Sequence, residues 1–169
     1  MSPPSEPIII ALGANLPHRR RSPQQSLKDV LAAMPGYGLH VIARSLWYRS
    51  RPVPASDQPD FINGVILVET ELEPELLLAR LHEIERAFGR TRRRRNEARA
   101  IDLDLIAYGG RVIPPSSGGL VLPHPRAHQR AFVLLPLRDV APDWCHPVTG
   151  QTLAALIDLL PHPHGVEPL

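Results

Sequence analysis

The chain is short of several residue types, and each shortage excludes a class of protein. Its single cysteine, Cys145, excludes an intramolecular disulfide and is typical of a reducing compartment. No apolar run approaches the ~20 residues that a membrane-spanning helix needs. The opening residues, MSPPSEP, lack the apolar core of a signal peptide. We therefore expect a cytoplasmic protein with no membrane partner.

Lysine is nearly absent as well, since Lys28 is the only one among the 19 basic residues. The net charge is only +2, and the arginines gather at HRRR (18–21) and RTRRRR (90–95). This clustering favours a local anion site over a generally basic surface. The glycine-rich GxxxxGK[ST] phosphate loop is missing too, so side chains would have to bind any phosphate groups.

What remains is the composition of a globular protein. The 169 residues are 43% hydrophobic and 21% charged, enough for one domain with a buried core. We expect a single domain over residues 1–169, with loose tails at 1–6 and 161–169.

Periodicity and turn residues predict a β-α-β-β-α-β order. Ser22 and Pro23 predict the start of a helix that runs to about Met34, and Gly89 predicts the end of a second helix. The expected strands cover 7–15, 40–50, 61–72 and the stretch 98–110, and the expected helices cover 22–34 and 74–88. This order is the ferredoxin-like α+β plan, an antiparallel sheet with helices on one face. A C-terminal hairpin, from the strand 111–113 and the stretch LVLPHPR (120–126), and short helices near 131–140 and 151–160 would follow. The plan alone does not indicate a function.

Two acids interrupt the apolar stretch ARAIDLDLIAYGG (98–110). Side chains alternate along a strand, so Asp102 and Asp104 would share one face, with Cα atoms roughly 6.5 Å apart. A divalent cation would relieve their mutual repulsion, and paired carboxylates suit Mg²⁺ that also takes substrate phosphate oxygens. Alternatively, the acids pair with the neighbouring arginines on a solvated strand face. Acids for a metal and arginines for phosphates together form the two halves of a phosphoryl-transfer site.

Several motifs in order carry a resemblance to a known family. They are ALGAN, DQPDFIN, IERAFGR, NEARAIDLDLI and LPHPRAHQRAFVLLPL, which extend through most of the chain. Together they resemble 6-hydroxymethyl-7,8-dihydropterin pyrophosphokinase of folate biosynthesis. The resemblance implies transfer of the pyrophosphoryl group of ATP to the hydroxymethyl oxygen of the pterin, with release of AMP.

The resemblance also implies roles for single residues on the ATP side. Asp102 and Asp104 would bind two Mg²⁺ ions that bridge the triphosphate, and Asp102 would also face the pterin hydroxyl. The remaining residues expected to act in catalysis or to contact ATP are Arg90, Arg92 and Arg99 of the arginine loop, His82 and Glu85 of the second helix, and His124 and Arg130.

On the pterin side, Asn63 would match one edge of the ring, because an amide offers both a donor and an acceptor. Phe61 and Phe132 would sandwich the ring, and the segment from Ser50 to Val53 would add backbone contacts. Departures from the family pattern include Asn96-Glu97-Ala98 in place of Trp-Gly-Pro before Arg99, and His82 in place of a Gln.

A competing interpretation is a single-stranded nucleic-acid-binding module that uses the arginine loop against phosphates. Such modules stack bases on aromatic residues of the central strands. Here the equivalent strand carries Asp102 and Asp104, which would repel a phosphate backbone. We expect a monomeric enzyme whose partners are ATP and the pterin, with no nucleic acid.

Overall fold

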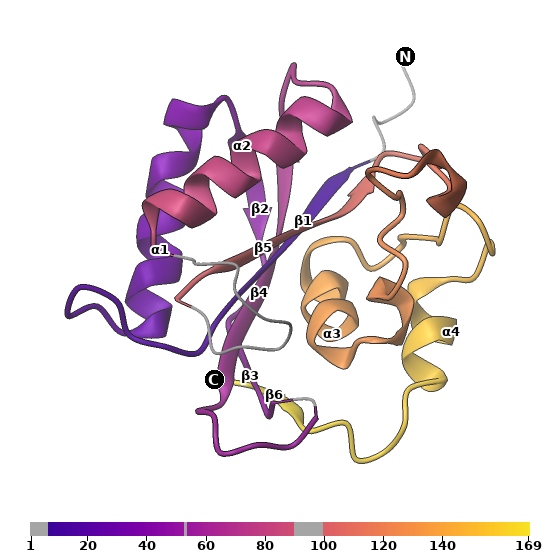
Figure 1. The fold of residues 1–169 in the computed structure, drawn as a ribbon. Coiled ribbons are helices and arrows are strands. Elements are labelled where there is room, and N and C mark those ends of the chain that lie inside the picture. Colours follow the sequence, from indigo (N-terminus) through magenta and orange to yellow (C-terminus); the bar gives the residue numbers. More distant parts are fainter. Residues whose placement is uncertain (1–6, 53, 90–99) are drawn as a thin grey trace.

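A computed structural model describes residues 7–52, 54–89 and 100–169 (Figure 1). The elements in chain order are β1 (Ile8–Ala14), α1 (Pro23–Ala33), η1 (Met34–Tyr37), β2 (His40–Arg44), β3 (Tyr48–Ser50), β4 (Phe61–Glu69), α2 (Pro74–Ala87), β5 (Asp102–Tyr108), η2 (Pro115–Ser117), η3 (Ala127–Gln129), α3 (Ala131–Val140), α4 (Leu153–Asp158) and β6 (Val166–Pro168). Among the described helices, none is long and apolar enough to cross a membrane.

The strands form one antiparallel sheet. Its order is β5-β1-β4-β3-β6, and β2 also pairs with β4. The two central strands, β1 and β4, carry the longest ladders, in which Gly13 lies opposite both Asn63 and Asp102. The fold is therefore a mixed α/β architecture on an antiparallel sheet, as the strand and helix order predicts.

Helices cover both faces of this sheet, where the prediction had them on one (Figure 1). On one face, Leu27 of α1 and Leu81 of α2 pack against Ile10 and other even-numbered residues of β1. On the other face, Leu134 of α3 and Leu156 of α4 pack with Ile9 and its odd-numbered neighbours. All seven residues of β1 are buried, because a strand covered on two sides needs apolar residues at every position.

Local signals explain the helix ends. The Ser22 side chain accepts a hydrogen bond from the Gln25 backbone N–H, and the Gln25 side chain accepts one from Ser22 N–H. This reciprocal pair satisfies two donors that the first turn of α1 leaves free. At the end of α2, Gly89 adopts a φ of 93°, a conformation that glycine reaches without steric cost.

The predicted strand over 40–50 is instead two strands, β2 and β3. The Ser45 hydroxyl accepts a hydrogen bond from Val65 N–H at 2.9 Å and donates to the Leu46 carbonyl at 2.7 Å. The chain then turns, and Leu46 N–H donates to the Asp139 carboxylate of α3. At the break the Ser45 backbone N–H still donates to the Val65 carbonyl at 2.9 Å, while the Ser45 hydroxyl supplies the acceptor for Val65 N–H.

The C-terminal expectations hold in part. Both short helices form, as α3 and α4, while the hairpin is reduced to one bridge between Ile113 and Leu122. The segment 161–169 is not a loose tail. Residues 166–168 form β6, which pairs with β3, and Leu169 N–H donates to the Trp47 carbonyl. The other expected tail, 1–6, lies outside the described residues.

Candidate active site

A cleft of about 800 Å³ opens over the middle strands of the sheet, beside the start of α3. It reaches past the edge strand β5 to α2 and, in the other direction, to the segment that precedes β6. The predicted site residues that line it are Ser50, Phe61, Asn63, His82, Asp102, Asp104, His124, Arg130 and Phe132. The chain thus brings residues from five separate stretches of the sequence into one cavity, within the volume range typical of ligand sites.

The two acids lie on β5 as the alternation predicts. Leu103 and Leu105 are buried in the core under α1 and α2, while Asp102 and Asp104 are partly exposed and line the cleft. Within the described ranges 7–52, 54–89 and 100–169, no three His, Cys, Asp or Glu side chains gather as a metal cage. Two carboxylates without a third protein ligand fit Mg²⁺, which keeps waters and takes its other oxygens from substrate phosphates.

Asn63 lies two strands away from Asp102, with Gly13 of β1 directly between them in the register. The Asn63 side chain is buried, and its Nδ2 donates to the Ser50 Oγ at 2.6 Å. A Cβ placed on Gly13 would come within 3.1 Å of Asn63 Oδ1. The absence of a side chain at residue 13 therefore leaves room beside the Oδ1 acceptor of Asn63, which lines the cleft.

The start of α3 and the turn before it supply one wall of the cleft. The Arg130 guanidinium lies over the Phe132 ring, with Cζ 5.5 Å from the ring centroid, within the range of a cation–π contact. Burial, reinforced by the charges of Arg130 and Arg126, lowers the pKa of His124 to about 4, against a smaller opposing effect of Asp102. His124 is therefore neutral at neutral pH. Its Nδ1 accepts from Arg126 N–H at 3.2 Å, so the proton of the neutral ring resides on Nε2.

On α2, His82 lines the cleft but Glu85 does not lie among the cleft residues. Glu85 is only 1% exposed, and its Oε2 accepts a hydrogen bond from Leu103 N–H at 3.0 Å. Leu103 separates the two aspartates along β5. Glu85 thus holds the strand that carries the acids, in addition to any part in nucleotide binding.

The end of β1 fixes the loop that leads into β4. The Asn15 side chain is 1% exposed, and its Nδ2 donates to Gln58 Oε1 at 3.1 Å and to the Pro59 carbonyl at 3.2 Å. Phe61, which lines the cleft, follows directly after this anchored segment. Asn15 is the last residue of the ALGAN motif. Its side chain holds the loop before β4 in place, a structural role that the sequence alone does not reveal.

Four predicted residues, Val53, Arg90, Arg92 and Arg99, lie outside the described residues. Sequence reasoning also missed parts of the cleft. Gly13 was quoted within ALGAN without a role. The segment before β6 contributes Leu160, Pro161, Pro163 and His164 to the lining, and β6 itself contributes Val166. Its proline content hid a strand of three residues, which is too short for a periodic signal.

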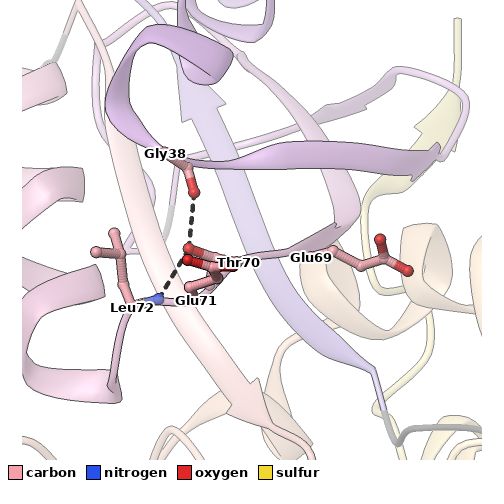
Figure 2. Close-up of a pocket in the computed structure, with 5 residues that line it drawn as sticks. All are labelled: Gly38, Glu69, Thr70, Glu71 and Leu72. Atoms are coloured by element: carbon pink, nitrogen blue, oxygen red, sulfur yellow. Dashed lines mark hydrogen bonds between the residues drawn. The ribbon is translucent and has the colours of Figure 1, made fainter.

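A second hollow, of about 480 Å³, lies at the far end of β4, six residues along the strand from Asn63 (Figure 2). Its centre is the Thr70 hydroxyl, which donates to the Gly38 carbonyl at 2.7 Å and accepts from Leu72 N–H at 3.2 Å. Figure 2 shows the Glu69 carboxylate directed away from these atoms. These hydrogen bonds hold the turn between β4 and α2 against Gly38, so we assign the polar groups of this hollow a structural role.

Comparison with known proteins identifies a family for this chain. Residues 9–142 match a family model described as 7,8-dihydro-6-hydroxymethylpterin-pyrophosphokinase (HPPK). Proteins named 2-amino-4-hydroxy-6-hydroxymethyldihydropteridine pyrophosphokinase are 40% identical over 149 residues in Haemophilus influenzae (88% of this chain, 89% of the relative). In Pseudomonas aeruginosa the identity is 38% over 162 residues, 96% of each chain.

Longer proteins contain a similar region. The chain is 38% identical over 165 residues to the folic acid synthesis protein fol1 of Pneumocystis carinii, which covers 98% of this chain and only 21% of that protein. The crystal structure of Plasmodium falciparum HPPK-DHPS with pteroate superposes with a TM-score of 0.71 at 14% identity, over 91% of this chain and 44% of that one. That likeness concerns the fold.

The family match and the relatives define the class as an ATP-dependent pyrophosphokinase of folate synthesis. The chain belongs to the 7,8-dihydro-6-hydroxymethylpterin-pyrophosphokinase family. Nothing in these comparisons supports the nucleic-acid-binding alternative.

Proposed function

We propose that the cleft binds ATP and 6-hydroxymethyl-7,8-dihydropterin side by side and transfers the pyrophosphoryl group between them. The observation that carries this proposal is the register Asp102–Gly13–Asn63 across three adjacent strands. Opposed Cα atoms lie about 4.5–5.5 Å apart, so Asp102 and Asn63 are roughly 10 Å apart. An acid for metal-bound phosphate and an amide for a ring edge are thus separated by about the length of one small substrate.

Asp102 and Asp104 would hold Mg²⁺, which neutralises the charge that builds up on the triphosphate when bound. We propose two ions, as the resemblance to the family implies. Arg130 would bind phosphate oxygens, and the neutral His124 would donate a hydrogen bond through Nε2. His82, at the α2 side of the cleft, would contact the nucleotide, as would Glu85 and the arginines at 90, 92 and 99.

The pterin end is proposed from the hydrogen bonds of Asn63. One N–H is committed to Ser50, which fixes the amide so that Oδ1 faces the space above Gly13. Oδ1 can then accept from a ring N–H of the pterin. Phe61 and Phe132, both partly exposed in the cleft, would cover the two faces of the ring, a geometry that adds ~0.5–1.5 kcal/mol beyond the area buried. Val53 would add a backbone contact.

Three wider proposals accompany this one. The strand order supports a ferredoxin-like plan, extended by β6 and by the helices on the second face. We also propose a monomer as the active unit. The single cysteine supports a cytoplasmic location.

The test is AMP release from ATP plus hydroxymethyl-dihydropterin, followed by mass spectrometry on Asp102→Asn and Asp104→Asn. Each change should lower turnover by about 100-fold or more, because a neutral amide is a poor Mg²⁺ ligand and leaves phosphate charge uncompensated. The melting temperature should stay level or rise, because the repulsion between the two carboxylates is removed.

Asp158→Asn is a matched control, since Asp158 is an exposed carboxylate on α4, and it should leave both quantities unchanged. If the two cleft mutants turned out active but destabilised, the acids would be partners of arginines on the surface, and the metal site would be refuted.

A further inference from the structure

The segment that precedes β6 lies against the cleft, and neither its composition nor its periodicity indicates a role there. We propose that this segment, residues 160–166, is the substrate-contacting wall at the pterin end, with His164 as its specificity-determining residue. The inference rests on the function proposed above and assigns a further residue to the same site.

The position of β6 places this wall at the pterin end. β6 lies at the opposite edge of the sheet from β5, the strand of the two acids. In the β3–β6 ladder, Val166 lies opposite Ser50, whose hydroxyl accepts the hydrogen bond from Asn63. Val166 is 8% exposed and packs in the core under α3. The wall is therefore joined to the Ser50–Asn63 pair through the backbone ladder and is anchored at its base.

The conformation of the segment fixes His164 in the cleft lining. Gly165 takes a φ of 68°, which turns the chain from His164 into β6. His164 Nδ1 accepts a hydrogen bond from Val166 N–H at 3.2 Å. With Nδ1 occupied as an acceptor, the neutral imidazole carries its proton on Nε2. The side chain is partly exposed and lines the cleft.

The chemistry of this side chain suits a flat heterocycle rich in ring nitrogens and oxygens. An imidazole held by its Nδ1 offers one N–H donor in the ring plane and an aromatic face. Asn63 offers an acceptor at the same end of the cleft, so the two together would match both kinds of polar group on a pterin edge. A ligand that has only phosphates would gain nothing from this wall, because the two acids proposed to hold Mg²⁺ lie at the other edge of the sheet.

The chain supplies a matched control two residues away. His162 belongs to the same segment, is exposed, and is absent from the cleft lining among the described residues. The rings of His162 and His164 are 5.6 Å apart. A general effect of losing a histidine from this segment, such as a change in its packing or charge, should therefore appear in both variants. Only a direct contact with substrate distinguishes them.

The experiment measures pterin binding by calorimetry, in the presence of Mg²⁺ and a non-hydrolysable ATP analogue, for wild type, His164→Asn and His162→Asn. Asn at position 164 can accept the Val166 N–H as the imidazole does, in an Asx-type turn, so the backbone is kept while the ring is lost. His164→Asn should weaken pterin binding about tenfold, the size of one lost hydrogen bond. It should leave the affinity for the ATP analogue and the melting temperature unchanged, and His162→Asn should match wild type throughout.

Equal pterin affinity in wild type and His164→Asn would overturn the inference, and so would equal losses in both histidine variants. Wild type that binds the ATP analogue but no pterin would instead overturn the proposed function. A drop in melting temperature for His164→Asn would be resolved with His164→Gln. If that variant keeps the melting temperature of wild type and the full pterin affinity, the inference also fails.

Discussion

Gly13 lies between the two ends of the proposed site, the acid Asp102 and the amide Asn63. It is the cross-strand neighbour of both Asp102 and Asn63, and its φ lies outside the left-handed region that only glycine occupies readily. Glycine is therefore not needed here for the backbone. The reason for it is space, because a Cβ would lie 3.1 Å from Asn63 Oδ1, closer than atoms normally approach.

We expect Gly13→Ala to weaken pterin binding by about tenfold while the melting temperature changes little. The added methyl group pushes on the amide that accepts from the ring, and each lost hydrogen bond costs ~0.5–1.5 kcal/mol. Gly119→Ala is the matched control, because no atom lies within 4 Å of a Cβ there. Calorimetric titration of both variants checks this, and an unchanged affinity for Gly13→Ala would mean that the space above residue 13 is not used.

His124 gives the stability of the protein a defined dependence on pH. Its pKa is about 4 in the folded protein, below the ~6.5 of an unfolded chain. Between these values the unfolded state binds a proton that the folded state does not. The free energy of unfolding should therefore fall as the pH drops from about 6.5 towards 4. The contribution is fully present above about 6.5, and below 4 this residue causes no further loss.

Because the imidazole is partly exposed, we expect the loss to be on the order of 1–3 kcal/mol. Urea unfolding of the wild type and of His124→Gln at about pH 7 and about pH 4.5 measures it, since Gln does not titrate. The wild type should lose more stability than the variant. Identical losses would show that His124 titrates normally in the folded protein.

At the scale of elements, the bond between α2 and β5 determines how the acids are presented. Glu85 on α2 accepts from the backbone N–H of Leu103, and the residues on either side of Leu103 are the two aspartates. A carboxylate from a helix thus acts as a partner for the strand β5, which among the described residues has no further strand beyond it in the sheet. The helix and the strand are held as one unit.

Glu85→Ala should lower both stability and turnover, because it leaves the Leu103 N–H buried without an acceptor, at a cost of ~1–3 kcal/mol. Glu85→Gln keeps an amide oxygen at that position and should retain more of both. Glu83→Ala is the control on the same helix, where only an exposed pair with Arg80 is lost. Thermal melting and AMP release on the three variants check this. If the Ala and Gln changes were equivalent, Glu85 would act through its charge and not through Leu103.

The elements also show what the sequence could predict. Capping by Ser22, the apolar face of α2 and the alternation around Asp102 all arise from neighbouring residues, so these expectations were confirmed. The break between β2 and β3 could not be predicted, because it depends on the Ser45 hydroxyl meeting Val65 N–H, twenty residues further along. The continuous apolar run of β1 is typical of a strand that is covered on both faces, and the helices on the two faces of the sheet cover it in this way.

At the scale of the whole molecule, some site residues could be predicted from local motifs, and others depend on contacts between distant parts of the chain. Asp102, Asp104, Asn63, Phe61 and Phe132 were identified from motifs, and the structure brings all of them into one cleft. Their individual roles remain proposals. His164 was invisible to motif reasoning because its importance depends on β6 pairing with β3, a contact between residues more than a hundred positions apart in the chain.

The cleft is lined from one edge of the sheet to the other, and this has a consequence for how the protein is made. A ribosome adds about 5–20 residues per second, so seconds pass between the appearance of Gly13 and that of Val166. Within this time β4 is synthesised and can pair with β1, but the proposed substrate-contacting wall, residues 160–166, has not yet been made. We expect a nascent chain that ends before residue 166 to bind pterin poorly, even where its core has formed. The onset of catalysis would then mark the completion of this segment.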